Sequence, residues 1–412
     1  MTSRERVLAA INHQQTDKVP IDLGATPSSG ISAIAYTNLT ANLGFSDSQT
    51  LIYDVVQELA QVEYPVIDHF GIDVLDVGRK FNNNADDWYE TKLSDGSKAF
   101  YPAWFHPERK EEKLIYYDHS GQAIAYKPDG ATFFDQACFP FLDAYPKDFS
   151  GLRDAMNKVL WQAMAHSPWD HASEPGFWDT LRDRTMNLRN TSDKALMMMA
   201  GCNLFEWGTF LRRMDQFLTD LYLERDNVEK LLDALMVQHL AGLEKICSSV
   251  GDLVDIIRLG DDLGTNSGPF MDPEIYREVF KPRHKILTDY IKKHSKARVF
   301  LHSCGSIYRL MPDLIEAGFE IINPVQTNAF EMDPRILKKE FGKDITFWGG
   351  GADTRFVLNN ARPAEVKKHV LENLEIFSKG GGFVFNTVHN ILPDVPPENI
   401  IAMYEAVRDF NR

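Results

Sequence analysis

Short apolar segments recur along this 412-residue chain, and a helical pattern follows most of them. β-Branched or aromatic residues dominate most of the segments, which is typical of strands buried on both faces of a sheet. We predict eight strands: Val19–Gly24, Ile72–Val77, Ala195–Ala200, Leu253–Leu259, Arg298–His302, Glu320–Asn323, Ile345–Trp348 and Gly382–Asn386. Eight β–α units in succession favour an α/β fold of the TIM type, a closed (β/α)8 barrel. A doubly wound open sheet is the rival topology, but no Gly-x-Gly-x-x-Gly motif follows the first strand to support dinucleotide binding.

Residues 78–194 separate the second and third predicted strands, which is too long for one connection. Its first part holds aromatic and β-branched runs broken by Asp95-Gly96, Ser120-Gly121 and Asp129-Gly130, which are hairpin signals. The part that follows predicts two or three helices. We therefore expect residues 1–412 to form a single barrel domain with an insertion at about 85–192. This insertion is either a lid over the strand ends or a packing accessory.

The overall charge limits the partners of the chain. A formal net charge of −15 disfavours nucleic acid and anionic membrane surfaces as partners. No apolar run reaches the length of about 18 residues that a membrane-spanning helix requires. The four cysteines form no Cys-x-x-Cys pair, and the N-terminus has the pattern of a capped helix instead of a signal peptide. These features indicate a reduced compartment, and we expect the protein to be cytoplasmic.

A histidine and a cysteine follow the fifth predicted strand, in the sequence Val299-Phe-Leu-His302-Ser-Cys304-Gly305. Residues two apart in an extended chain point the same way, so His302 and Cys304 can meet one ion. Zinc accepts both nitrogen and sulfur and can leave one position open for a substrate. The last strand delivers His389 in the same way, and parallel strands of a barrel all end on one face. We therefore predict a metal site at His302, Cys304 and His389, although all three could instead have packing or hydrogen-bonding roles.

Adjacent carboxylates follow the fourth predicted strand, in Gly260-Asp261-Asp262. Their mutual repulsion favours a retained proton or a cationic partner, so Asp261 and Asp262 are candidate general acids. Lys281 and Arg283, one helix later, are candidate ion-pair partners. Alternatively, one of the two carboxylates caps the next helix along the chain.

Other polar residues lie at predicted strand exits, where a barrel of this type has its active site. Asp73 is a further candidate catalytic carboxylate. Glu206, Gln326, Asn390 and Asp353 are candidate substrate-binding residues. Taken alone, each of them is more often structural than catalytic, but together they line one mouth of the barrel.

The order of several motifs resembles the uroporphyrinogen decarboxylase superfamily, most closely its branch of cobalamin-dependent methyltransferases. The matching stretches are Gly260–Asp262, Lys281–Arg283, His302–Gly305, Asn323–Gln326, Thr346–Gly350 and Pro393–Ile400, together with Arg4–Pro20. The resemblance implies a small-molecule substrate, zinc bound through His-x-Cys, and a corrinoid carried on a partner protein. It also leaves a homodimer open.

Two departures from this family matter. The decarboxylases carry an arginine-rich stretch that binds propionate groups, whereas residues 21–28 here contain no arginine. Asp73 could still correspond to their catalytic aspartate. The methyltransferases supply a later cysteine to zinc, where this chain has His389.

Three functions follow from the sequence. The first is a zinc-dependent, corrinoid-linked methyltransferase acting on a small methyl donor or thiol acceptor. The second is a metal-independent decarboxylase of a porphyrin or another acid. The third is a non-catalytic protein that binds a metal or a corrinoid, because fold alone does not determine function.

Overall fold

The computed structural model describes residues 1–161 and 166–412. A curled sheet of seven parallel strands forms its centre, and each strand pairs with the next one along the chain. The strands are β3 (Val74–Asp76), β10 (Ala195–Gly201), β11 (Ile256–Gly260), β12 (Arg298–His302), β13 (Ile321–Asn323), β14 (Thr346–Trp348) and β15 (Phe383–Val384). Seven of the eight predicted strands therefore form, mostly one to three residues shorter than predicted.

The segment around Ile21 closes this sheet into a barrel. The backbone N–H of Asp22 donates to the carbonyl of Phe385 (2.9 Å), and the N–H of Phe385 donates to the carbonyl of Pro20 (2.8 Å). On its other side, the carbonyl of Ile21 accepts from the N–H of Asp73 (2.8 Å). The first predicted strand, Val19–Gly24, is thus reduced to a bridge, because Pro20 has no N–H to donate. The predicted (β/α)8 barrel is confirmed.

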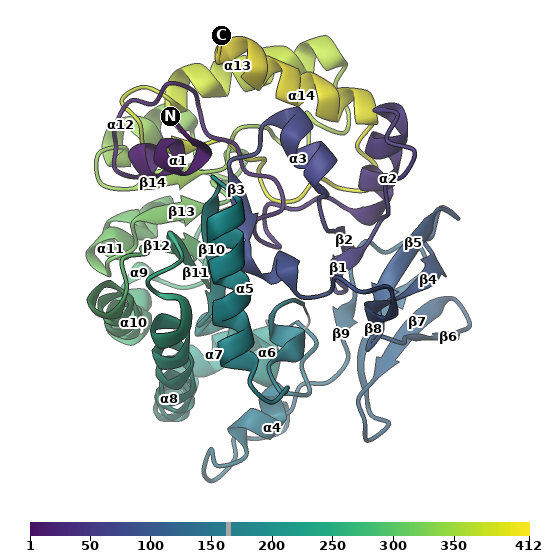
Figure 1. Ribbon diagram of the computed structural model, residues 1–412. Coiled ribbons are helices and arrows are strands. Elements are labelled where there is room, and N and C mark those ends of the chain that lie inside the picture. The colour runs from purple at the N-terminus through teal and green to yellow at the C-terminus, as the bar shows by residue number, and fades with distance from the viewer. Residues whose placement is uncertain (162–165) are drawn as a thin grey trace.

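Helices surround the barrel (Figure 1). They are α1 (Ser3–Ile11), α2 (Ala33–Asn42), α3 (Tyr64–Phe70), α5 (Phe177–Thr191), α6 (Phe205–Arg212), α7 (Met214–Leu223), α8 (Arg225–Val250), α9 (Pro273–Ile275), α10 (Lys281–His294), α11 (Met311–Glu316), α12 (Pro334–Phe341), α13 (Pro363–Phe377) and α14 (Pro397–Phe410). Thr2 and Glu5 form the expected capping box at the start of α1. Among the described residues, no helix combines the length and apolar character that crossing a bilayer requires.

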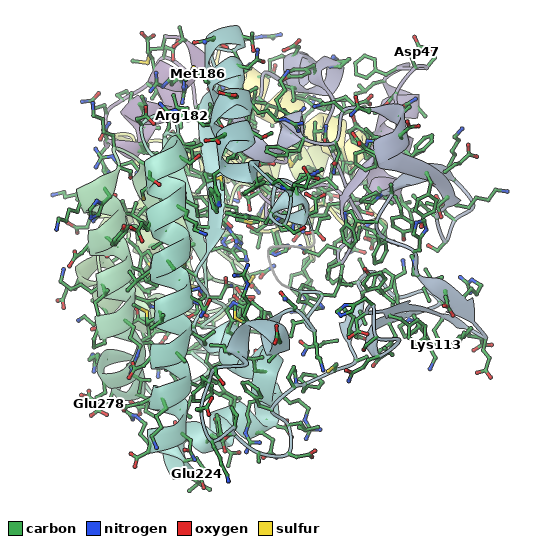
Figure 2. All side chains as sticks on the ribbon, turned by 60° about the horizontal axis from the view of Figure 1, so that its bottom comes forward. Asp47, Lys113, Arg182, Met186, Glu224 and Glu278 are labelled. Carbon is green, nitrogen blue, oxygen red and sulfur yellow. The ribbon has the colours of Figure 1, made fainter. Side chains whose placement is uncertain are left out.

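The inserted region consists of small antiparallel sheets beside the barrel (Figure 1). Its strands are β4 (Trp88–Lys92), β5 (Lys98–Pro102), β6 (Glu108–Lys110), β7 (Lys113–Tyr117), β8 (Ala123–Pro128) and β9 (Asp135–Gln136), followed by α4 (Leu152–Met156). The predicted turn residues Gly96, Gly121 and Gly130 all have positive φ, as tight hairpin turns require. Lys113 lies at the far side of the sheets from the barrel (Figure 2).

The packing of helix α5 suggests where the insertion ends. Helix α5 packs against α8 and leads directly into β10, so it occupies the position of the barrel helix between β3 and β10. We therefore assign to the insertion only the hairpins and short helices before α5. A further small pair, β1 (Ile52–Asp54) and β2 (Leu59–Ala60), connects it to the barrel, since Leu51 forms a bridge with Phe100. Residues 162–165, within the predicted range, lie outside the described residues.

Apolar side chains fill the half of the barrel that lies at the amino ends of the strands. Ile256 of β11, Phe300 of β12 and Ile321 of β13 form one cluster there with Val7 and Ile11 of α1, so α1 closes this end. Side chains two residues further along a strand point the same way and form the next layer up. That layer lies at the carboxyl ends of the strands, where barrels of this type bind their substrates.

Candidate active site

His302, Cys304 and His389 meet at the carboxyl ends of the strands. One donor atom from each lies within 4.8 Å of the other two. The Cys304 Sγ is 3.4 Å from the His302 Nε2, and the centroids of the two imidazole rings are 5.3 Å apart. The structure therefore brings together the three residues that the sequence predicted as metal ligands.

The backbone around Cys304 leaves room only for glycine. Gly305 has φ of +86°, and a Cβ there would lie 2.2 Å from the carbonyl oxygen of Gly264. The loops after β11 and β12 thus pack backbone against backbone, which fixes Cys304. His389 also has positive φ, +72°, a conformation that is uncommon outside glycine and often marks a functional position.

A hydrogen-bond chain sets the tautomer of His302. The Asn323 Nδ2 donates to the carbonyl of Trp348 (2.8 Å), which leaves the Asn323 Oδ1 facing the His302 Nδ1 at 2.6 Å. The Nδ1 must therefore carry the proton and donate it, so the Nε2 presents a lone pair toward Cys304. Metal-binding histidines are commonly oriented in this way by a second hydrogen bond.

The protonation states of the three side chains also suit a cation. Burial lowers the pKa of His302 and of His389 to about 3, so both imidazoles are neutral and have a free lone pair. Burial and the nearby Asp262 and Glu206 raise the pKa of the Cys304 thiol well above its usual value. A bound cation would offset these effects and favour the thiolate. Two neutral imidazoles and one thiolate are a donor set that fits zinc with one position open.

Two carboxyl groups lie beside this triad. The Asp262 Oδ1 accepts from the backbone N–H of Cys304 (2.8 Å), and the N–H of Asp262 donates to the Glu206 Oε2 (3.1 Å). Burial, then the charges of Asp262 and Asp261, raises the pKa of Glu206 to about 8. Burial also raises the pKa of Asp262. Glu206 is therefore protonated near neutral pH and can donate a proton.

One cavity of about 130 Å³ lies against both histidines of the triad and both carboxyl groups. It is lined by His302, His389, Asp262, Glu206 and Arg258, and also by Pro27, Ser28, Asp54, Val56, Gln57, Trp161, His166, Met199, Gly201 and Asn203. Trp161 and His166 flank the undescribed residues 162–165 and belong to the insertion, which therefore contributes to the wall of the site.

Arg258 and Asp54 are cavity residues that the sequence analysis did not single out. Arg258 interrupts the apolar run of β11, and that charged residue within a buried strand was the available signal. The cations that the sequence did suggest lie elsewhere. Lys281 pairs with Asp313 and Glu316, and Arg283 pairs with Asp233. Both lie on α10, outside the barrel.

Asp261 has a structural role. Its carboxylate is fully buried and accepts from the backbone N–H groups of Phe205 (3.0 Å) and Glu206 (2.9 Å), at the start of α6. The His284 Nε2 lies 3.2 Å from the same carboxylate. Asp261 thus caps α6, a helix that precedes it in the chain, and not the next helix as the sequence suggested, while Asp262 faces the candidate ligands.

The other predicted residues have different positions. The Asn390 side chain accepts from the N–H of Gly30 and donates to Gln57, a cavity residue. The Gln326 Oε1 accepts from the N–H of Gly305 and so supports the Cys304 loop. Asp353 accepts from the N–H groups of Arg355 and Phe356 within its own turn, and it does not line the cavity.

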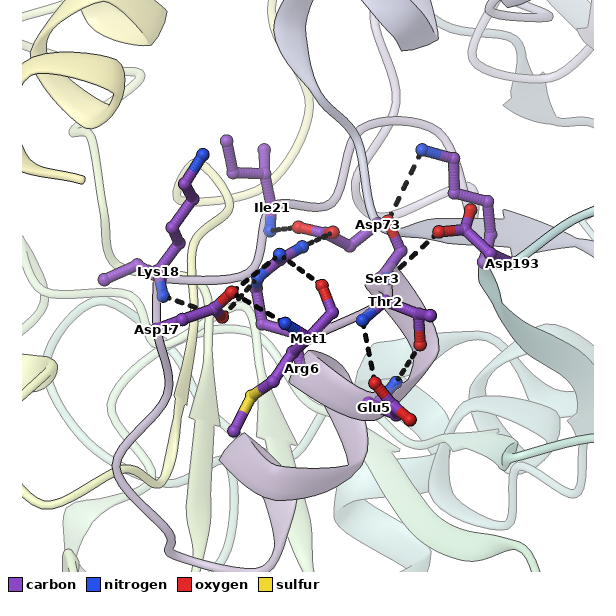
Figure 3. Close-up of polar contacts among 12 residues, drawn as sticks. Met1, Thr2, Ser3, Glu5, Arg6, Asp17, Lys18, Ile21, Asp73 and Asp193 are labelled. Atoms are coloured by element: carbon purple, nitrogen blue, oxygen red, sulfur yellow. Dashed lines mark hydrogen bonds and ion pairs between the residues drawn. The ribbon is translucent and has the colours of Figure 1, made fainter. Parts of the chain in front are cut away.

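Asp73 lies at the opposite end of the barrel, because it precedes β3 instead of following it. Its carboxylate pairs with Arg6 (2.6 Å) and accepts from the N–H of Ile21 (2.9 Å), as Figure 3 shows. A larger hollow of about 480 Å³ opens beside it, but the three candidate ligands are not among its lining residues. The structure therefore does not bring Asp73 to the candidate site.

Replacing Asp73 by asparagine should consequently affect stability and leave metal binding unchanged. We expect a loss of about 2 kcal/mol, the typical size of a hydrogen bond to a charged group, because Arg6 keeps its second partner, Asp17. Thermal unfolding and zinc content measured on the same preparation check this. Normal stability with lost turnover would instead support a catalytic Asp73.

Comparison with known proteins places these features in a family. The model of the uroporphyrinogen decarboxylase (URO-D) family matches residues 204–410. The uroporphyrinogen decarboxylase of Methylococcus capsulatus is 43% identical over 51 residues, which are 12% of this chain and 15% of that protein. That of Legionella pneumophila is 24% identical over 212 residues, 51% of this chain and 55% of that protein. The alignments thus span about half or less of these curated relatives.

A solved structure described as a methyltransferase from Methanosarcina mazei has the same fold. It superimposes with a TM-score of 0.60 over 100% of both chains, at 17% sequence identity. At this identity the likeness concerns the fold alone.

Proposed function

Because this chain belongs to the uroporphyrinogen decarboxylase family, we propose that it is a zinc-dependent methyltransferase that exchanges a methyl group between a small substrate and a corrinoid on a separate protein. The observation that carries the proposal is the convergence of His302, Cys304 and His389 within 4.8 Å at the mouth of the barrel. Zinc bound there would act as a Lewis acid toward a thiol sulfur or an ether oxygen of the substrate.

The side chains around the triad have matching roles in this proposal. Asn323 fixes the tautomer of His302, and Asp262 fixes the backbone of Cys304. Glu206, with its pKa raised to about 8, holds a proton that it can give to a leaving oxygen or sulfur atom. The cavity of about 130 Å³ suits a substrate of few atoms.

The proposal is tested with two measurements on the purified protein. Elemental analysis should find about one zinc per chain, as expected for a single three-ligand site. Absorption spectra of cob(I)alamin should then show cobalt methylation when a small methyl ether or methyl thioether is supplied. A protein that binds no zinc and methylates no cobalt would refute the proposal.

Metal-independent decarboxylation is the second candidate, favoured by the names of the curated relatives and by the Glu206–Asp262 pair. Its substrate would be a small acid, because a cavity of about 130 Å³ is small for a tetrapyrrole and residues 21–28 supply no arginine. Turnover that survives Cys304→Ser but is lost in Asp262→Asn would favour this candidate.

A further inference from the structure

Arg258 lies inside the barrel, directly below the candidate metal ligands. Its neighbour two residues earlier, Ile256, belongs to the apolar cluster in the lumen, so the Arg258 side chain points into the same lumen one layer higher. In the pairing of β11 with β12, Arg258 stands opposite Phe300 and Gly260 stands opposite His302, so His302 lies two residues closer to the carboxyl end. Arg258 and His302 both line the cavity.

The guanidinium of Arg258 lacks a charged partner. Arg258 is only 9% exposed. Nevertheless, no carboxylate of the described residues lies within 4.0 Å of its guanidinium nitrogen atoms. Residues 162–165, outside the described part, contain no acidic side chain. Among the described residues, the buried Nε has no hydrogen-bond partner, and one terminal nitrogen makes a long contact of 3.4 Å to the Ser28 hydroxyl. A buried charge in this state is costly unless a ligand satisfies it.

The surroundings hold this side chain in place and keep it charged. Burial lowers the pKa of Arg258, while the nearby Glu206 and Asp262 raise it, and an arginine remains protonated throughout the working range. Gly260 stands beside the guanidinium, because a Cβ there would lie 3.1 Å from the Arg258 Nη1. Glycine at this position therefore leaves space for the guanidinium at the floor of the cavity.

Two positive charges in the site can attract an anion. Asp262 and Asp54 are the carboxyl groups that share the cavity with Arg258, together with Glu206, which is protonated near neutral pH. A divalent ion bound by one thiolate and two neutral imidazoles would add a further positive charge. An acid placed between that ion and Arg258 would meet a cation at each end, and a planar guanidinium matches a carboxylate through two parallel hydrogen bonds.

We propose that Arg258 binds the carboxylate of a small organic acid and holds its methyl-bearing end toward His302, Cys304 and His389. This inference rests on the proposed function, since it names the substrate class for the same site. It makes Arg258 a specificity-determining residue that selects acids over neutral analogues.

The test compares acids with their neutral amides in binding calorimetry on the zinc-loaded protein. The probes are methoxyacetate and 3-methoxypropionate, which differ by one methylene, against 2-methoxyacetamide and 3-methoxypropanamide. Each acid should bind about 10- to 100-fold more tightly than its amide, the range expected for hydrogen bonds to a charged group. Equal affinities for acid and amide would overturn the proposal.

The variant Arg258→Met keeps an unbranched side chain out to the position of the Nε and removes the charged guanidinium, so it should abolish the preference for the acid. Arg309→Met is the matched control, because Arg309 pairs with Glu331 on the surface and should leave the preference unchanged. If Arg258→Met does not fold, the acid and amide affinities of the unaltered protein still decide. If the protein prefers acids over amides but does not methylate cobalt, the methyltransferase proposal is refuted and the role of Arg258 is not. If it methylates cobalt but does not prefer acids, the role of Arg258 is refuted and the methyltransferase proposal is not.

Discussion

Replacing Cys304 by serine is expected to lower the zinc affinity of the protein by about 100-fold. Structural zinc sites with four ligands contribute about 10–16 kcal/mol, so the loss of one ligand corresponds to roughly 3 kcal/mol. Serine keeps the size of the side chain but offers a neutral hydroxyl in place of a thiolate. Competition with a chromophoric chelator measures the affinity directly, without any assumption about the substrate.

Cys138→Ser is the matched control for this prediction. Cys138 is also a buried free cysteine, but it lies in the inserted region after β9 and away from the cavity. Its replacement should leave zinc affinity unchanged. If Cys304→Ser binds zinc as tightly as the unaltered protein, the three side chains do not form a metal site, and the decarboxylase becomes the better candidate.

The position of the candidate ligands could be predicted from sequence because it depends on rules that hold along every strand. A parallel barrel places all carboxyl ends on one face, so a histidine at the end of β12 and another after β15 lie at the same mouth. The prediction that His302 and Cys304 point the same way needed only the two-residue repeat of an extended chain. The first strand was less predictable, because its role in closing the barrel rests on a few hydrogen bonds around Ile21 and not on a long apolar run.

The roles of the charged residues depended on three-dimensional contacts that the sequence does not contain. Asp261 and Asp262 are neighbours, but one faces the start of α6 and the other faces the Cys304 loop. Lys281 and Arg283 were near in sequence to this pair, yet α10 directs both toward acidic residues outside the barrel. Arg258 was missed because the other residues of β11 are apolar or glycine. The segment was therefore assigned as a buried strand, and its one charged residue was not considered as part of a site.

Asp261 has the structural role of the two neighbouring aspartates, so its replacement has the largest expected effect on stability. We expect Asp261→Ala to destabilise the protein by about 3–5 kcal/mol, because it removes the acceptor of two buried N–H groups and the partner of buried His284. It also removes the negative charge from the N-terminus of α6, where the helix dipole favours one. Thermal unfolding should show the change as a clearly lower midpoint.

Asp262→Asn is the informative comparison, because the neighbouring side chain keeps an oxygen that can accept from the N–H of Cys304. Its unfolding midpoint should remain near that of the unaltered protein, with a stability change within about 1 kcal/mol. Turnover should nevertheless fall, since the amide lacks the negative charge that raises the pKa of Glu206 and so supports its proton. If the two variants behave in the opposite way, so that Asp261→Ala unfolds normally and loses turnover, then Asp261 is the catalytic carboxylate and Asp262 the structural one.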